Sequence, residues 1–221
     1  MSRAPRSDVV TAVENIQRQL RPLLKGRGFA VRGRTFNRTT ADGLTQVVKF
    51  QTGSSDPPGT TYIPGLRENL YGLFTVNLGV YIPEVAALHG GGSAKSWVQD
   101  YNCAVRQRLG SASGSSTDLW WSAEATPEVV DDVQLRLGSS GLMFLDRFAT
   151  RDLVLAELLG HGENLDYCST PRIVCAIILL KRGKTDEARA LMAAQAKEST
   201  PNVHHPAYVR QLADRMGLGT L

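Results

Sequence analysis

The sequence predicts an α+β fold: an antiparallel sheet of about five strands packed on an N-terminal helix and followed by a C-terminal helical segment. Three observations favour this class. Residues 73–83 (LFTVNLGVYIP) alternate in side-chain type with a period of two, which is typical of a strand with one buried face. Residues 7–25 carry apolar side chains at helical spacing, and the patterns beyond about residue 150 are all helical. We expect an α+β domain over residues 1–149 and a helical appendage over residues 150–221.

Length and composition limit the classes of protein to which the chain can belong. Its 221 residues suit one ordinary domain with a smaller addition. A content of 42% hydrophobic and 21% charged residues is typical of a soluble globular protein. No apolar run reaches the roughly 18 residues that span a bilayer. The start, MSRAPRSDVV, has no apolar segment behind its basic residues, as a secretory signal would have. We therefore expect a cytoplasmic protein.

Cysteine and histidine usage gives no sign of a disulfide framework or a metal site. The three cysteines, Cys103, Cys168 and Cys175, are an odd number without a CxxC pair, and we expect three buried thiols. The four histidines lack the spacing of metal ligands. No metal and no cofactor is therefore expected.

The first elements in chain order are a helix and a hairpin. The helix is expected over residues 7–25, with Ser7 as its cap and Pro22 shortening its last turn. Residues 32–51 read as two strands around a turn at Asp42-Gly43, since this pair tolerates the positive φ angles of tight hairpins. Residues 52–69 contain three prolines and three glycines, so we expect a long loop before the central strand.

After the central strand, the patterns become shorter. Residues 83–88 suggest a short turn or helix, and the glycines at 90–92 break it without the lysine of a phosphate-binding loop. Residues 100–110 alternate again and predict another strand. A Gly- and Ser-rich turn is expected over 111–117, and a short last strand over 118–122 places Trp120 and Trp121 on opposite faces.

The period changes to that of a helix at Thr126, which is followed by Pro127 at the first helical position. Further helices are expected at about 141–159, 171–182, 185–198 and 207–216. The run AIILLKRGKTDEARALMAAQ predicts a helical hairpin similar to the turn of a tetratricopeptide repeat, but a solenoid needs about three such units. We interpret it as a packing appendage, with partner binding as the alternative.

Several of these runs together resemble a known family. KGRGFAVRGRTFNRTTADGLTQVVKFQ, FTVNLGVYIPE, CAVRQRLG and the pair Trp120-Trp121 occur in the order and spacing of the bacterial domain-of-unknown-function family numbered 4304. The resemblance covers roughly residues 10–145. It implies an α+β domain from bacteria and supplies no reaction.

Chemistry is expected on the more polar face of the sheet. If strands 44–51, 73–82 and 101–109 lie in one antiparallel sheet, eight polar side chains share that face: Lys49, Gln51, Thr75, Asn77, Tyr81, Asn102, Arg106 and Arg108. Three are cations and none is a carboxylate, so the face suits an anionic or amide-bearing ligand or an acidic protein patch. The alternatives are that the face simply meets water, or that Asn77 bonds the backbone of the long loop.

The leading functional hypothesis is a non-enzymatic binding module that holds a protein partner on this face, with an immunity or toxin-neutralising role as one form. Trp120 or Trp121, together with Tyr81, would supply the aromatic anchors, which requires a wide, flat and exposed face. The oligomeric state and the partner's identity stay open.

Two other functions remain. Nucleic-acid binding is suggested by the first fifty residues, which hold ten Lys and Arg against three Asp and Glu, whereas the remainder holds fifteen against eighteen. An enzyme acting on a small anionic substrate would use a pocket under the long loop, with Asp56, Glu68 or His89 as acid or base. No nucleophile motif is present, so enzymatic activity is uncertain and the less favoured option. The cations of the nucleic-acid hypothesis are Arg32, Arg34, Arg38, Lys49, Arg106 and Arg108.

Overall fold

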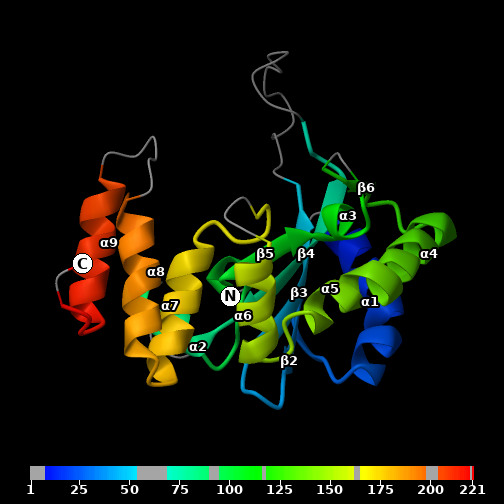
Figure 1. The fold of residues 1–221 in the computed structure, drawn as a ribbon. Helices are drawn as coiled ribbons and strands as arrows, with labels where there is room; N and C mark the ends of the chain where they lie inside the picture. The colour runs from blue at the N-terminus through cyan, green and yellow to red at the C-terminus, as the bar shows by residue number, and fades with distance from the viewer. Residues whose placement is uncertain are drawn as a thin grey trace, which may run out of the picture. The chain divides into compact units, whose positions relative to one another are not determined.

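The computed structural model describes residues 8–53, 69–89, 95–115, 118–161, 165–197, 204–219 and 221, and it is an α+β structure (Figure 1). Its sheet has the strand order β1-β2-β3-β4-β5, and β6 also pairs with β4. Strand β1 pairs with β2, and β4 pairs with β6, in antiparallel orientation. The strands are β1 (Ala30–Arg32), β2 (Thr35–Thr39), β3 (Thr45–Thr52), β4 (Leu73–Tyr81), β5 (Val105–Arg108) and β6 (Trp121–Ser122). The predicted fold class is confirmed.

Contacts group the chain into two compact units, each built from three segments. The first unit comprises residues 1–38, 47–78 and 107–144, and the second comprises residues 39–46, 79–106 and 145–221. The expected α+β domain over residues 1–149 and helical appendage over residues 150–221 stay a prediction.

The first unit has a core formed by the N-terminal helix and a row of aromatic rings. Helix α1 (Asp8–Gly26) buries one apolar stripe completely, and Gln17 donates a hydrogen bond of 2.7 Å to the carbonyl oxygen of Gly33. The centroids of successive rings in the row lie 5.7 to 6.3 Å apart, which is contact distance for aromatic side chains. The row consists of Phe36, Phe50, Phe74 and Trp121.

Helix α4 (Pro127–Arg136) packs against α1 and begins where its cap was expected, because the Thr126 hydroxyl accepts a hydrogen bond from the Val129 amide. A π-helical turn, η2 (Leu137–Gly141), follows it and meets the short α3 (Leu109–Ala112). Gly141 is required there, since a Cβ at this position would lie 2.8 Å from the Leu109 side chain. The single helix expected over 141–159 is wrong, because α5 (Leu142–Asp146) ends before a new capped helix starts at Arg151.

The second unit holds most of the C-terminal helices. Helices α6 (Arg151–Gly160), α7 (Pro171–Lys181), α8 (Thr185–Lys197) and α9 (His205–Arg215) pack in sequence, each against the next. They lie side by side in Figure 1. The predicted tight turn between α7 and α8 is confirmed, with Gly183 at a φ of 75°. Helix α2 (Pro83–Leu88) packs on α7, which is the most apolar helix and is almost wholly buried.

The connecting segments before and after β4 were expected to be a long loop and an extended strand. The strand expected over 100–110 is shorter, because a 3-10 turn, η1 (Asp100–Asn102), occupies its first residues. Most of the long loop, residues 54–68, lies outside the described residues, as do Asp56, Glu68 and the glycines at 90–92. No helix among the described residues is both long and apolar enough to cross a membrane.

Candidate functional site

The polar side chains of β4 are buried, unlike the exposed face that the alternation predicts. Thr75, Asn77 and Tyr81 are 0%, 7% and 3% exposed. In the first unit, the Thr75 hydroxyl donates to the Leu119 carbonyl oxygen at 3.0 Å, so residue 119 covers this face. The period of two is correct, but both faces of the strand are covered, and these side chains are not presented to solvent.

Asn77 forms an internal hydrogen bond with the neighbouring strand. Its Nδ2 atom donates to Oε1 of Gln51 at 2.6 Å. Gln51 and Lys49 on β3 are half-buried. The pair Asn77–Gln51 therefore has a structural role, because an amide in the middle of a buried strand requires a partner.

The two tryptophans have different environments. Trp121 is 6% exposed, stacks on Phe74 with 5.7 Å between the ring centroids, and donates from Nε1 to Asp132 at 2.8 Å. This burial corrects its expected role as a surface anchor, since the ring completes the aromatic row of the core. Trp120 is half-buried and lies under the Arg108 guanidinium, whose carbon is 4.9 Å from the ring centroid.

Asp118 joins Trp120 and Arg108 into one cluster. It accepts a hydrogen bond of 3.0 Å from Trp120 Nε1 and forms an ion pair with Arg108. The side chains of Arg108 and Asp118 are 34% and 52% exposed. Of the residues predicted for the site, Trp120 and Arg108 therefore lie together and partly exposed to solvent. With Asp118 they form the Trp120–Arg108–Asp118 cluster.

The cations proposed for nucleic-acid binding are engaged in several separate contacts. Arg34 donates to the Thr52 hydroxyl at 3.1 Å, and Arg38 lies over the Phe29 ring with 4.8 Å to its centroid. Arg106 is exposed and lies 3.8 Å from the Asp100 carboxylate in the second unit. Of these partners only Asp100 carries a charge, so the Arg106 guanidinium is the one whose charge is partly compensated.

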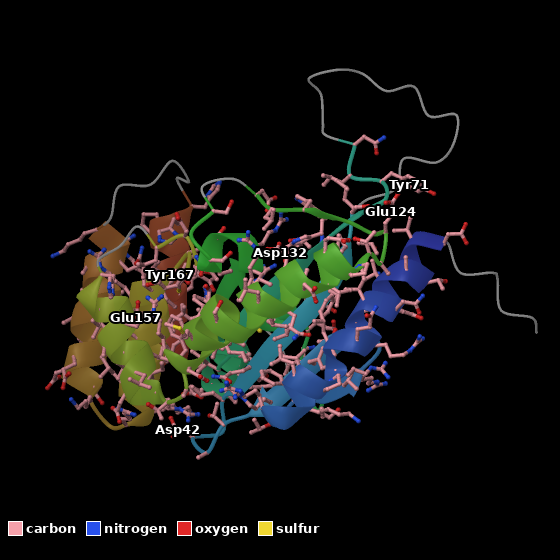
Figure 2. The ribbon with its side chains drawn as sticks, turned by 90° about the vertical axis from the view of Figure 1, so that its right-hand side faces the viewer. Asp42, Tyr71, Glu124, Asp132, Glu157 and Tyr167 are labelled. Carbon is pink, nitrogen blue, oxygen red and sulfur yellow. The ribbon has the colours of Figure 1, made fainter. Side chains whose placement is uncertain are left out.

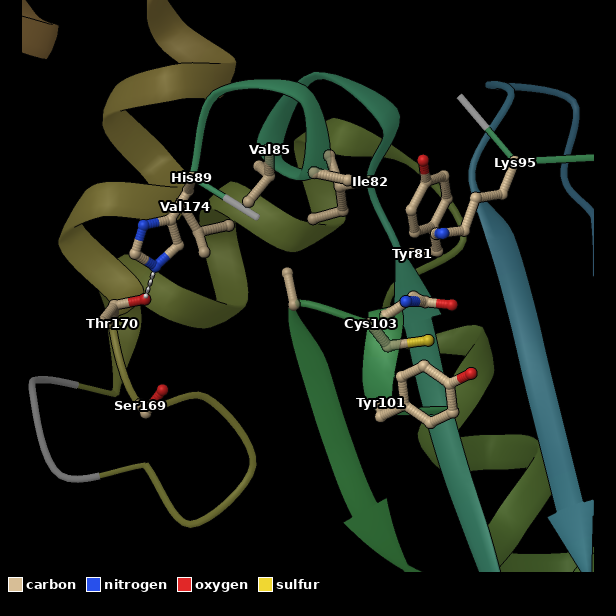
Figure 3. A pocket seen from close by; sticks show the side chains of 13 residues that line it. Tyr81, Ile82, Val85, His89, Lys95, Tyr101, Cys103, Ser169, Thr170 and Val174 are labelled. Atoms are coloured by element: carbon tan, nitrogen blue, oxygen red, sulfur yellow. Dashed lines mark hydrogen bonds between the residues drawn. The ribbon is translucent and has the colours of Figure 1, made fainter. Parts of the chain in front are cut away.

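A pocket of about 200 Å³ lies in the second unit, and we call it the Tyr81 pocket (Figure 3). It is formed by the end of β4, helix α2, the segment around η1 and the start of α7. Thirteen residues line it, and none is an aspartate or glutamate: Tyr81, Ile82, Val85, Ala86, His89, Lys95, Tyr101, Asn102, Cys103, Ala104, Ser169, Thr170 and Val174.

Tyr81 contributes a hydroxyl group that lacks a hydrogen-bond partner. Among the described residues, three buried side-chain polar atoms have none, namely Arg21 Nε, Trp97 Nε1 and Tyr81 Oη. Of these three residues, Tyr81 lines the pocket. An unsatisfied buried hydroxyl costs about 1–3 kcal/mol, so a polar ligand atom or a water that reached it would recover free energy.

His89 closes another wall of the pocket and is held on both sides. Its Nδ1 lies 2.7 Å from the Tyr208 hydroxyl on α9, and its Nε2 lies 3.2 Å from the Thr170 hydroxyl at the start of α7. Burial, followed by the charges of Arg215 and His205, lowers its pKa below 6.5. A neutral imidazole with both nitrogens engaged is a positioned wall residue rather than an available base.

Cys103 lines the pocket beside Tyr101, on the side away from His89 (Figure 3), and the reactivity of its thiol is suppressed. Burial raises its pKa far above the ordinary value, with a further increase from Asp100. The thiol donates to the Gln99 carbonyl oxygen at 3.6 Å and packs on Gly79, where a Cβ would lie 2.7 Å from the sulfur. A protonated, packed thiol is a poor nucleophile.

Outside the pocket, the second unit contains two charged networks that fasten helix α6. Arg151 contacts both Glu84 oxygens at 2.6 and 2.9 Å, and its backbone amide donates to Asp42 at 2.6 Å. Glu157 accepts a hydrogen bond of 3.0 Å from Tyr167, and the two lie close together in Figure 2. Both networks pair their charges internally, which indicates a structural role.

Sequence reasoning found some residues of the pocket and missed others. Tyr81 and His89 were singled out for different functions, and the structure brings them to one pocket. Lys95, Cys103 and Thr170 were not considered as ligand contacts. The glycine at 79 was the available signal, since a strand glycine suggests close approach of another segment. Within the described residues, nowhere do three His, Cys, Asp or Glu side chains gather as metal ligands.

Comparisons with known proteins give one match. No curated protein matches the chain significantly, and neither does any solved structure. The family match spans β4, β5, β6 and α4, which include the buried polar strand and the Trp120–Arg108–Asp118 cluster. The sequence resemblance is thereby confirmed for the central part of the chain: residues 67–144 match the model of the family described as Domain of unknown function (DUF4304).

Proposed function

We propose that this protein is a non-enzymatic binding protein of the bacterial cytoplasm that holds a small polar molecule in the Tyr81 pocket. The observation that carries the proposal is the Tyr81 hydroxyl, which is buried, finds no hydrogen-bond partner in the described part of the chain, and belongs to a residue that lines the pocket. Native proteins rarely leave such a group unsatisfied without a functional reason.

Binding is favoured over catalysis by the state of the reactive groups in the lining. His89 has both nitrogens engaged, Cys103 is held as a thiol, and the thirteen lining residues include no carboxylate. Catalysis by general acid and base needs a group poised to exchange a proton at the pH of the cell. The buried thiols Cys103, Cys168 and Cys175 are in keeping with a reducing compartment, which supports the cytoplasmic location.

A pocket-filling variant with a neighbouring control tests this function. Ala86 lines the pocket and is half-buried, whereas Ala87 is exposed on the same helix. Both variants, Ala86→Leu and Ala87→Leu, would be compared with the wild type by thermal-shift screening against a library of small polar metabolites. We expect ligands that raise the melting temperature of the wild type and of Ala87→Leu but not of Ala86→Leu. Equal responses in all three proteins would contradict the proposal.

A protein partner remains the second candidate function, supported by the Trp120–Arg108–Asp118 cluster. Tryptophan and arginine dominate the energetics of many interfaces, and here they are stacked, partly exposed and held by a carboxylate. A toxin-neutralising role would be one form of this candidate. Co-precipitation should lose the partner with Trp120→Ala and retain it with Tyr81→Phe; loss with neither variant would contradict it. Nucleic-acid binding has less support, because Arg34, Arg38, Arg106 and Arg108 are each engaged in a separate contact.

A further inference from the structure

The polar side chains of the Tyr81 pocket favour one sign of charge. Oδ1 of Asn102 accepts a hydrogen bond of 3.2 Å from the backbone amide of Gln99. The group that Asn102 can offer to a ligand is therefore its Nδ2 donor. The Lys95 ammonium only donates, the hydroxyl groups of the lining can donate as well as accept, and carboxylates are missing from its thirteen residues. Besides the Cys103 thiol, the polar groups of the lining are those of Tyr81, His89, Lys95, Tyr101, Asn102, Ser169 and Thr170.

The carboxylates that lie next to the pocket in sequence are already paired. Asp100 precedes Asn102 in η1, and its side chain is 4% exposed and 3.8 Å from the Arg106 guanidinium. Glu84 precedes Val85 in α2, and its side chain is 8% exposed and 2.6 Å from Arg151. Their negative charge is compensated locally, and the Lys95 ammonium remains the cation of the lining.

The rest of the wall is apolar, which determines the kind of ligand body that fits. Ile82, Val85 and Val174 are buried side chains from β4's end, α2 and α7. In Figure 3, Tyr81 and Lys95 lie at one side of the pocket, whereas His89, Thr170 and Ser169 lie at the other. A volume of 200 Å³ corresponds to about seven water molecules, so a single small ring or branched chain fills it.

On the basis of the proposed function, we propose that the molecule held in the Tyr81 pocket is a small organic anion. It would be a carboxylate or a phosphate monoester attached to an apolar group. Lys95 attracts the anionic group, and Tyr81 and Asn102 supply uncharged donors. The apolar body lies against Val85 and Val174. Hydrogen bonds to an ionised acceptor are stronger than those to a neutral one, which favours the anion at a site built of donors.

The test uses four probes that share one benzene ring and differ in charge: benzoate, phenyl phosphate, benzamide and benzylammonium. Each is titrated into the full chain, and the amide resonances of residues 81, 82, 84–86 and 102–104 are followed by NMR. Lys95→Gln removes the cation of the lining. Lys197→Gln is the matched control, because Lys197 is exposed in the same unit and does not line the pocket.

We expect at least one anionic probe to bind at these residues at least about fivefold more tightly than benzamide, with benzylammonium not binding. Lys95→Gln should weaken the anion about three- to fivefold, the effect of an exposed charge pair, while Lys197→Gln stays within twofold of the wild type. Equal affinities of benzoate, phenyl phosphate and benzamide, or indifference to Lys95→Gln, would overturn the inference and leave the binding pocket intact. Absence of any probe from the pocket, together with equal thermal-shift responses of the Ala86 and Ala87 variants, would overturn both proposals.

Discussion

Replacing Tyr81 with phenylalanine should stabilise the protein without its ligand. The ring is retained, so apolar burial is unchanged, and the hydroxyl that is removed has no hydrogen-bond partner among the described residues. An unsatisfied buried polar group costs about 1–3 kcal/mol, and a water in the pocket would reduce this, so we expect a gain near 1 kcal/mol. For a chain of this length, that gain raises the melting temperature by about 2–4 °C.

Tyr208 provides the matched control, because the same change there removes a hydroxyl that is hydrogen-bonded to His89 at 2.7 Å. Tyr208→Phe should therefore lower the free energy of unfolding by about 1 kcal/mol. Urea-induced unfolding, followed by circular dichroism, measures both variants against the wild type. If Tyr81→Phe were destabilised as much as Tyr208→Phe, the Tyr81 hydroxyl would have a partner, and the argument for the pocket would fail.

Three other predictions concern the second unit. Gly79→Ala should cost about 1–3 kcal/mol, because the new methyl group would lie 2.7 Å from the Cys103 sulfur, and Cys103→Ala should recover part of the loss in urea titrations. Burial lowers the pKa of His89 below 6.5, so only the unfolded chain gains this proton as the pH falls through 6.5. The stability of the fold should therefore decline below that pH. Thermal melts between about pH 5 and 7 should show a flatter decline in His89→Gln than in the wild type. Arg151→Met should lower the free energy of unfolding by about 3–5 kcal/mol in urea titrations, because the Glu84 carboxylate, 8% exposed, loses its counter-ion.

Each of these predictions has an outcome that contradicts it. Full stability in Gly79→Ala would mean that the segment carrying Cys103 moves away from β4 at little cost. A pH dependence identical in wild type and His89→Gln would assign the acid sensitivity to another group. For Arg151→Met, the comparison is Arg182→Met. The partner of Arg182, Asp152, is 81% exposed, so this ion pair should contribute at most about 1 kcal/mol. Equal losses of stability in the two variants would contradict the larger contribution of the buried Arg151–Glu84 pair.

Local signals in the sequence were sufficient for most of the elements. Alternation located β4, Asp42-Gly43 located the hairpin turn, and Thr126 located the start of α4, because each of these patterns acts within a few residues. The π-helical turn after α4 and the break before α6 were missed. Both depend on packing partners distant in sequence, as with the side chain of Leu109 against Gly141.

The candidate site was only partly accessible to sequence reasoning. Alternation separates two faces of a strand but cannot distinguish water from a second layer, and for this reason Thr75 and Asn77 were placed on an exposed face. Adjacent tryptophans must point in opposite directions, but sequence does not tell which one enters the core. The Tyr81 pocket combines residues 81–104 with residues 169–174, which no spacing rule connects.

The most direct test of the account is a crystallographic soak of the full chain with benzoate. The account predicts electron density for the ring against Val85 and Val174, with the carboxylate within reach of Lys95 and a polar contact to the Tyr81 hydroxyl. Density for benzoate elsewhere on the protein, with an empty pocket and the Tyr81 hydroxyl bonded to another protein group, would contradict it.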